Sequence, residues 1–455
     1  MKSILLVPKQ IVTVNSKNEI LPNHAVEIVN GKIERIVSLK DLRTSEYDAD
    51  ILDYHNYTLI PGFIQTHIHL CQTLFRGLAD DLELLDWLQK RIFPYENSHT
   101  KDSLRTSVRL GLHDLLTGGT TTILDMGTLR HQEIIFDELI SSGIRAFAGN
   151  CMMDKNELNP TFCESTDWNI KSTYDWAKSF HNSNNGKVKY GFAPRFVLSC
   201  SEKLLKETKN MMKDFQGSVF HTHSSENKSE IETVKRMTGK ENVEYFESIG
   251  ILDQNTVLAH CVHLNDKEVK TLKTNSVRVA HCPSSNLKLG SGIANIPRYM
   301  KEGISVSLGS DGAPCNNGLS IFNEMMLAAL IQKPIHGATV MDALTVFRLA
   351  TIEGAKALHI DKEVGSIEVG KKADLVLLDL EKADQPLQLD DQQDLPGSRQ
   401  VYSSIVYSAS KENVKIVMIE GELVMDDGRC LMFDEKQLVQ NGKIELQQLF
   451  KRVHI

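Results

Sequence analysis

The chain of 455 residues lacks long apolar runs, and it lacks any concentration of positive charge. A membrane-spanning helix needs about 20 consecutive apolar residues, so no membrane partner is expected. Lysine and arginine number 51 against 59 aspartates and glutamates, which gives a formal net charge of -8. Nucleic-acid binding depends on clustered basic side chains, and the scattered ones here predict no nucleic-acid partner.

The sequence also has few cysteines, eight in all, and none of them forms a CxxC pair. A disulfide scaffold and a cysteine-based zinc site both depend on closely spaced cysteines, so neither is expected. The first apolar run, Ile4–Val7, is too short for a secretory signal peptide. Together these absences predict a cytoplasmic protein.

Both ends of the chain have the texture of β-strands. Alternating apolar and polar residues recur at 24–29, 32–37, 373–378 and 414–419. Asn30-Gly31 separates the first two runs, and this dipeptide favours a tight hairpin turn. We therefore predict one small β-sandwich domain formed by residues 1–57 and 366–455, with a polar surface loop at 390–400.

Between these ends, short apolar runs alternate with longer helical patterns, which is typical of parallel βα units. Eight strands are expected, at 58–69, 120–126, 144–152, 188–196, 218–224, 256–264, 277–282 and 305–311. Eight units predict an α/β protein with a (β/α)8 TIM barrel over residues 58–365, whose active site would lie at the carboxyl ends of the strands. An open, doubly wound sheet is the alternative, although no GxGxxG sequence opens a helix here.

Metal-binding side chains end four of the expected strands. They are His67, His69, His221, His223, His260 and Asp311. Residues two apart on a strand project from the same face, so His67 and His69 can reach one ion. Several imidazoles with one carboxylate suit zinc or iron(II) with a position left for water. The sequence therefore predicts a divalent metal at the barrel mouth.

Three stretches resemble the amidohydrolase superfamily. Residues 61–69 (PGFIQTHIH) are similar to its first-strand signature. Residues 281–290 (HCPSSNLKLG) and 310–317 (SDGAPCNN) resemble the branch of S-adenosylhomocysteine, methylthioadenosine and 5′-deoxyadenosine deaminases. That branch also contains guanine deaminases and s-triazine hydrolases. The resemblance covers nearly the whole chain, including the two-ended β-sandwich.

The resemblance implies one divalent ion, zinc or iron(II), and four ligands to it. These are His67, His69, His223 and Asp311. His221 is the nearest rival to His223, and the family pattern H-x-x-E, met by His223 and Glu226, favours His223. No lysine stands as a bridging ligand where the fourth strand ends at Arg195, so the two-metal form of the fold is not expected.

The resemblance also implies catalytic roles for Glu226, His260 and Asp311. Hydrolytic deamination adds hydroxide to a ring carbon that bears an amino group and then expels ammonia. Asp311 would take a proton from the water, and His260 would orient the water and stabilise developing charge. Glu226 would protonate the ring nitrogen beside the attacked carbon, a step for which a positioned carboxyl is suited.

Five residues are expected at the substrate: Gln72, Trp87, Arg195, Phe196 and Glu226. Trp87 matches an aromatic wall in relatives, whereas Gln72, Arg195 and Phe196 match positions that contact the purine in guanine deaminases. A guanidinium donates readily to a purine carbonyl, which an adenine lacks. Residues 74–81 and 311–317 instead resemble the adenosine group, and we give these more weight.

The expected function is therefore a metal-dependent deaminase of a 5′-modified adenosine, which gives the inosine analogue and ammonia. The 5′-deoxyadenosine, methylthioadenosine and adenosylhomocysteine types all fit. The alternatives are a guanine or 8-oxoguanine deaminase, an s-triazine amino- or chlorohydrolase, and a catalytically dead binding protein. The expected partner is a small aminopurine or nucleoside, and we expect a homo-oligomer.

Overall fold

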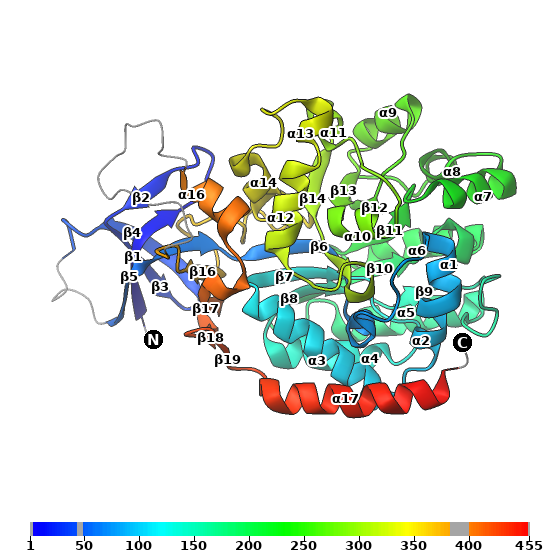
Figure 1. Ribbon diagram of the computed structural model, residues 1–455, viewed down its shortest axis with the longest axis horizontal. Coiled ribbons are helices and arrows are strands. Elements are labelled where there is room, and N and C mark those ends of the chain that lie inside the picture. Colours follow the sequence, from blue (N-terminus) through cyan, green and yellow to red (C-terminus); the bar gives the residue numbers. More distant parts are fainter. Residues whose placement is uncertain (1–2, 43–48, 383–399, 454–455) are drawn as a thin grey trace.

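The structure is a computed structural model that describes residues 3–42, 49–382 and 400–453. A barrel and a smaller sheet lie side by side, and the sheet, at the left of Figure 1, combines blue and orange strands from the two ends of the chain. Across the described ranges, none of the helices combines the length and the apolar character that crossing a bilayer requires.

The barrel sheet runs in the order β14-β13-β12-β11-β10-β8-β7-β6-β15, with β9 paired to β10. Its segments are β6 (Phe63–His69), β7 (Thr120–Asp125), β8 (Arg145–Ala148), β9 (Cys151–Met152), β10 (Val188–Pro194), β11 (Val219–Ser224), β12 (Thr256–His260), β13 (Arg278–His281), β14 (Ser305–Leu308) and β15 (Asp311–Gly312). All of their pairings are parallel. Because β15 follows β14 and pairs with β6, the ring closes. The predicted (β/α)8 barrel is confirmed.

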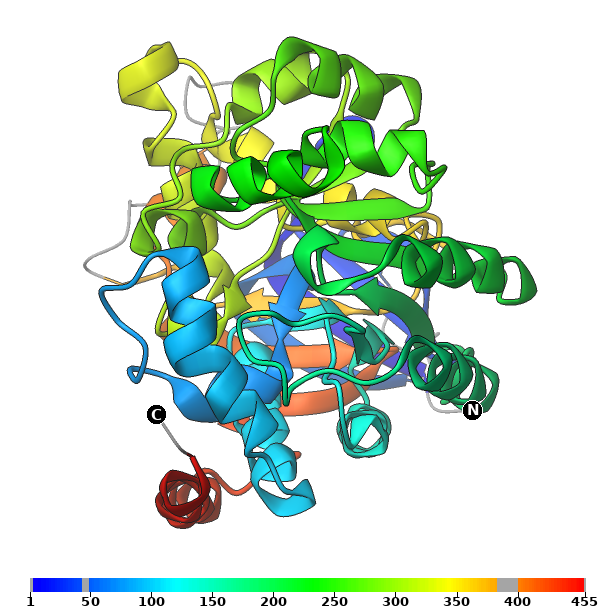
Figure 2. The ribbon, with the colours of Figure 1, turned by 90° about the vertical axis from the view of Figure 1, so that its right-hand side faces the viewer.

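Helices surround this ring, as the end-on view in Figure 2 shows. Between successive barrel strands lie α3 (Lys101–Thr117), α4 (Gln132–Ser142), α5 (Thr166–Phe180), α6 (Glu202–Met211), α7 (Lys228–Thr238), α8 (Asn242–Ser248), α9 (Asp266–Thr274) and α11 (Ile296–Lys301). After the last barrel strand come α12 (Ile321–Leu330), α13 (Lys333–His336), α14 (Ala343–Leu349) and α15 (Ile352–Ala357). Local sequence sets their starts. For example, Thr100 and Ser103 form a capping box that satisfies free backbone donors at the start of α3.

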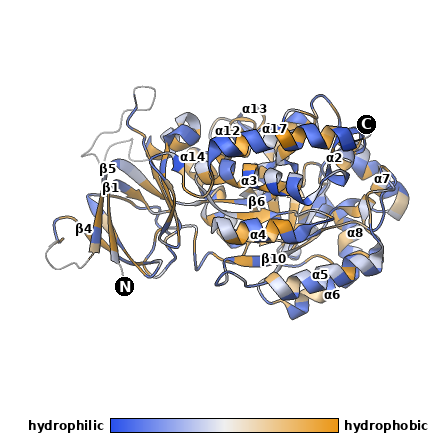
Figure 3. Ribbon diagram, turned by 90° about the horizontal axis from the view of Figure 1, so that it is seen from below, coloured by the Kyte–Doolittle hydropathy of each residue, from blue (hydrophilic) through white to orange (hydrophobic). Residues whose placement is uncertain are grey.

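Burial explains why the barrel strands could be recognised in the sequence. Every residue of β6, β7 and β12 is buried, because helices cover one face and barrel side chains fill the other. Strands buried on both faces tend to contain apolar runs, such as Val257-Leu258-Ala259 in β12. In Figure 3 the inner strands β6 and β10 are mostly orange, whereas blue and orange alternate along the outer helices.

The smaller sheet joins both ends of the chain in one hydrogen-bonded array, β19-β18-β17-β16-β5-β1-β3-β4, with β2 paired to β1. Its strands are β1 (Ser3–Val12), β2 (Ile20–Pro22), β3 (His24–Val29), β4 (Lys32–Ser38), β5 (Ala49–Pro61), β16 (Leu375–Leu378), β17 (Val414–Ile419), β18 (Glu422–Asp426) and β19 (Arg429–Cys430). Ile33 of β4 and Ile416 of β17 share one buried core, so strands from the two ends of the chain pack against each other. The Asn30-Gly31 turn joins β3 to β4 with φ of 52° and 75°, the positive values that this turn requires.

The division at residues 57 and 366 stays a prediction, and one strand of the small sheet extends beyond residue 57. Strand β5 continues in the small sheet as far as Pro61, and the Gly62 amide donates to the Asp374 carbonyl at 2.9 Å. The last helix, α17 (Glu435–Arg452), lies along α3 of the barrel and buries Leu438 and Leu449. Residues 390–399 lie outside the described residues, and Gln400 begins α16 (Gln400–Ser403).

Candidate active site

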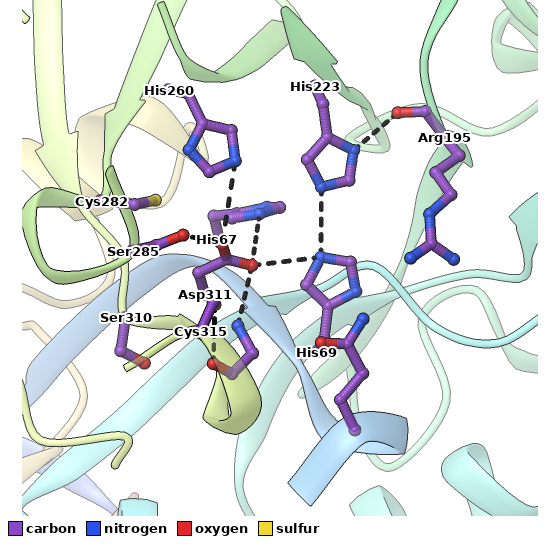
Figure 4. A network of polar contacts seen from close by, with 12 residues as sticks. His67, His69, Arg195, His223, His260, Cys282, Ser285, Ser310, Asp311 and Cys315 are labelled. Atoms are coloured by element: carbon purple, nitrogen blue, oxygen red, sulfur yellow. Dashed lines mark hydrogen bonds and ion pairs between the residues drawn. The ribbon is translucent and has the colours of Figure 1, made fainter. Parts of the chain in front are cut away.

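The side chains predicted to bind metal meet at the carboxyl ends of the barrel strands. They come from β6 (His67 and His69), β11 (His223) and β15 (Asp311), and His260 of β12 joins them. Four of the five are buried, and His223 is partly buried. Figure 4 shows the imidazoles and the carboxylate pointing toward one another.

The spacing within this cluster suits a single cation. His69 Nε2 lies 3.2 Å from His223 Nε2, and Asp311 Oδ1 lies 3.2 Å from His67 Nε2 and 3.3 Å from His69 Nε2. Two ligands about 2.0–2.1 Å from a tetrahedral ion are separated by about 3.3 Å. Ligand atoms of His67, His223, His260 and Asp311 also lie within 4.8 Å of one another.

The state of these side chains also fits a cation. Among the described residues, the buried His67 Nε2 has no hydrogen-bond partner of good geometry, and an unsatisfied buried polar atom is costly. Burial lowers the pKa of His69 and of His223 well below the usual range. The imidazoles are therefore neutral, the form that ligates a metal. The donor set and the geometry of the cluster suit a divalent metal.

Hydrogen bonds behind the cluster orient two of its imidazoles. His223 Nδ1 donates to the Arg195 backbone carbonyl at 2.7 Å, which directs Nε2 toward the centre. His67 Nδ1 lies 2.8 Å from His221 Nε2, on the opposite side of the ring from Asp311. His221 thus contacts the edge of the His67 ring that points away from the cluster, whereas the His223 ring points into the cluster.

Two residues of the cluster have strained backbones. His260 has a φ of 72° and Asp311 a φ of 61°. Positive φ is uncommon for residues other than glycine, and such strain concentrates where function demands a fixed geometry. The surrounding packing therefore holds both side chains at this site against their local preference.

Glu226 follows β11 and lies beside His260. Its Oε2 is 3.4 Å from His260 Nε2, and the residue is 4% exposed. Burial, with a contribution from the charge of Asp311, raises the pKa of Glu226 well above its usual range. A protonated carboxyl at this position has a proton available to donate.

Apolar side chains form the wall of the pocket next to this cluster. Trp87 and Phe196, two of the residues expected at the substrate, line it, and so do Leu84 and Leu88. Helix α1 (Leu84–Trp87) and the π-helix that follows it, Leu88–Ile92, supply three of the four. These short helices, which the sequence analysis did not identify, place a flat aromatic ring and two aliphatic side chains over the barrel mouth.

Gln72 and Arg195 also line the pocket, but their donors are directed elsewhere. Arg195 Nη1 and Nη2 donate to the two carboxylate oxygens of Glu96 at 2.7 and 3.1 Å, and Gln72 Nε2 donates to Glu96 Oε1 at 2.7 Å. The guanidinium also lies 4.9 Å from the centre of the Phe93 ring. Glu96 lies in α2 (Phe93–Asn97). The sequence did not point to it, because its partner Arg195 is 99 positions further along the chain.

A closed βα barrel with a histidine and aspartate cluster at its mouth defines a metal-dependent hydrolase by class. The chain belongs to the amidohydrolase family, whose sequence model, described as "Amidohydrolase family", matches residues 58–424. The family resemblance drawn from the sequence is confirmed.

Two curated relatives align over most of the chain. A 5′-deoxyadenosine deaminase of Methanocaldococcus jannaschii is 36% identical over 91% of this chain and 94% of its own. A 5-methylthioadenosine/S-adenosylhomocysteine deaminase of Thermodesulfovibrio yellowstonii is 34% identical over 97% of each.

Solved structures are similar over comparable lengths. An adenosine deaminase of Xanthomonas campestris with bound zinc has a TM-score of 0.90 and 26% identity, and the match covers 99% of both chains. A guanine deaminase of C. acetobutylicum with bound guanine has a TM-score of 0.82 and 26% identity, covering 93% of this chain and all of the other.

Proposed function

We propose that the protein is a metal-dependent hydrolytic deaminase of a 5′-modified adenosine. The substrate would be of the 5′-deoxyadenosine, methylthioadenosine or adenosylhomocysteine type, and the products are the inosine analogue and ammonia. The observation that carries the proposal is a buried carboxyl, Glu226, 3.4 Å from His260 and beside the cation cluster. The names of relatives at 34–36% identity supply the substrate class.

His67, His69, His223 and Asp311 would hold one divalent ion, and His260 would remain free for the reaction. Zinc is proposed rather than iron(II), because the similar Xanthomonas campestris enzyme contains zinc. When bound, such an ion lowers the pKa of water to about 7 and so makes a nucleophile available at neutral pH.

The chain's own residues then move the protons. The Asp311 carboxylate accepts a proton from water as the oxygen adds to the ring carbon that bears the amino group. Glu226 donates its proton to the neighbouring ring nitrogen, which lets the ring accept the electron pair. His260 accepts a hydrogen bond from the adding oxygen. The proton held by Asp311 passes to the amino nitrogen, the bond from that nitrogen to carbon breaks, and ammonia leaves. The remaining hydroxyl proton returns to Glu226 as the ring carbonyl forms, so both carboxyl groups regain their starting states. Proton transfers of this kind contribute typically ~10²–10⁴-fold.

Five residues are proposed to border the substrate, and all of them line the pocket. They are Gln72, Trp87, Arg195, Phe196 and Glu226. An aromatic ring can pack against the face of a purine, which suits Trp87 and Phe196. Gln72 and Arg195 border the substrate while Gln72 Nε2 and Arg195 Nη1 donate to the Glu96 carboxylate.

The hydrogen bonds from Arg195 to Glu96 bear on the choice between an adenosine and guanine as the substrate. A guanine deaminase needs donors for the purine carbonyl, and Arg195 was the residue expected to supply them. Its Nη1 and Nη2 already donate to Glu96. They are therefore not directed at a purine carbonyl, which supports the adenosine substrate.

We accordingly expect kcat/KM for the best 5′-substituted adenosine to exceed that for guanine by ~10²-fold, or about 2.7 kcal/mol in transition-state binding. Ammonia release from 5′-deoxyadenosine, methylthioadenosine, adenosylhomocysteine, guanine and melamine measures this directly. A higher value for guanine would contradict the adenosine proposal and favour a guanine deaminase. A higher value for melamine would favour the s-triazine hydrolase instead, and no ammonia from any compound would favour the binding protein.

Two further properties are proposed. All eight cysteines are free and seven of them are buried, which supports a reducing, cytoplasmic location. We also propose a homo-oligomer, which light scattering on the purified protein would test.

A further inference from the structure

The stretch 281–286 (HCPSSN) contributes no side chain to the proposed chemistry, yet it lies against the cluster. It ends β13 and opens the short helix α10 (Pro283–Lys288). Two adjacent residues of this helix, Ser285 and Asn286, are buried, at 0% and 1% exposed. Each makes one hydrogen bond to a side chain to which we assign a role in deamination.

Ser285 holds the carboxylate of Asp311. Its Oγ donates to Asp311 Oδ2 at 2.7 Å, and the Gly312 amide donates to Oδ1 at 2.8 Å. Oδ1 is also the oxygen nearest His67 and His69. With one donor on each oxygen, the plane of the carboxylate is fixed and Oδ1 stays directed at the cation cluster. Figure 4 shows Ser285 on the side of Asp311 away from His69.

Asn286 holds the imidazole of His260. Its Oδ1 lies 2.9 Å from His260 Nδ1, and because a carbonyl oxygen only accepts, Nδ1 carries the hydrogen. In a neutral ring, Nε2 then presents its lone pair toward Glu226, 3.4 Å away, and Asp311 Oδ2, 3.9 Å away. In the other tautomer, Nε2 could not accept a hydrogen bond from the adding oxygen.

The helix that carries this pair is itself anchored from outside the site. The Ser284 amide donates to Glu324 Oε2 of α12 at 3.1 Å, and Ser284 Oγ donates to Glu324 Oε1. Ser284 therefore points away from the cluster, while the next two residues point into it. One helical turn thus connects the barrel wall to both side chains.

We infer that Ser285 and Asn286 are paired positioning residues for the deamination, Ser285 acting through Asp311 and Asn286 through His260. The inference rests on the proposed function and deepens it. Among the described residues, strand β13 places no side chain in the cluster of proposed ligands. The helix that follows it, α10, contributes this pair instead. Because Asp311 would be a metal ligand and His260 would not, the two members have different expected effects.

The test compares Ser285→Ala, Asn286→Ala and the matched control Ser284→Ala in the zinc-loaded protein. Zinc affinity is measured by competition with a chelator, and kcat and KM are measured for 5′-deoxyadenosine. Removing a group that orients a metal ligand typically costs about 10–100-fold in metal affinity or activity. We expect Ser285→Ala to weaken zinc binding by ~10-fold or more and to lower kcat. Asn286→Ala should lower kcat by ~10-fold or more, with zinc affinity and KM nearly unchanged.

Conservative variants separate positioning from folding. Ser285→Thr keeps the hydroxyl and Asn286→Asp keeps the acceptor, so both should recover most of the lost function. Ser284→Ala removes the hydroxyl bond to Glu324 but keeps the backbone amide bond that anchors the helix. It should therefore leave zinc affinity and kcat at the parent values, although its melting temperature falls. The inference is overturned if Ser284→Ala matches the other two, or if Ser285→Ala keeps the parent zinc affinity, or if Asn286→Ala keeps the parent kcat. A parent inactive on every adenosine would instead overturn the proposed function, and the role of Asn286 with it, while the zinc measurement still decides Ser285.

Discussion

Replacing both His67 and His69 with alanine should leave the protein without bound metal and without measurable deamination. The two imidazoles come from one strand face, and Asp311 Oδ1 lies 3.2 and 3.3 Å from their Nε2 atoms. Their removal takes away half of the proposed ligand set. Water then keeps its pKa of about 15.7 rather than ~7, so kcat should fall by more than ~10⁴-fold.

Elemental analysis of the purified variant and its parent checks this result. The matched control is His336→Ala, which changes an exposed histidine of α13 far from the cluster in sequence and should leave metal and activity unchanged. The ligand assignment is wrong if the double variant keeps the parent metal content. It is also wrong if the parent binds two ions per chain.

Glu226→Gln should lower kcat by ~10²-fold or more while the metal stays bound. Glutamine keeps the size of the side chain and removes the proton that the acid would donate. The raised pKa of the buried carboxyl means that the native residue has that proton to give. Because Glu226 is not among the proposed ligands, zinc content should not change.

The control for this variant is Glu232→Gln, the same substitution on the exposed face of α7. Steady-state ammonia release and elemental analysis on both proteins give the comparison. Activity of Glu226→Gln within a few-fold of the parent would refute the acid role. Loss of metal in this variant would move Glu226 into the ligand set.

The barrel and its cluster were predictable because their signals are local in sequence. Strands such as β12 are buried on both faces, so they have apolar runs that stand out between amphipathic helices. The i, i+2 spacing of His67 and His69 alone places both on one face. The ends of parallel strands converge at the mouth of a barrel, so side chains that end separate strands meet there.

Features that depend on contacts between residues far apart in the chain could not be predicted from local sequence patterns. The Arg195–Glu96 ion pair joins residues 99 positions apart, and the sequence around each residue does not indicate its partner. Arg195 therefore looked available to a purine carbonyl. Alternation also cannot rank His221 against His223, since both share one strand face. The H-x-x-E pattern favoured His223, and in the structure the contact of His221 with His67 separates the two.

The edges of the two parts were likewise set by tertiary contacts. Strand β5 stays in the small sheet to Pro61 because it pairs with β16 from the far end of the chain. Helix α17 lies on the barrel because Leu438 and Leu449 pack there. Both arrangements depend on contacts between residues far apart in the chain, and the pattern of a single strand or helix does not predict such contacts.

The measurement that tests the account most directly is a zinc titration of the metal-free protein, followed by ammonia release from 5′-deoxyadenosine. One ion held by His67, His69, His223 and Asp311 predicts no release without zinc. Release should then rise linearly and reach a plateau at one equivalent, with one inosine analogue formed per ammonia. Deamination by the metal-free protein, a plateau only at two equivalents, or no ammonia at full loading would contradict the account.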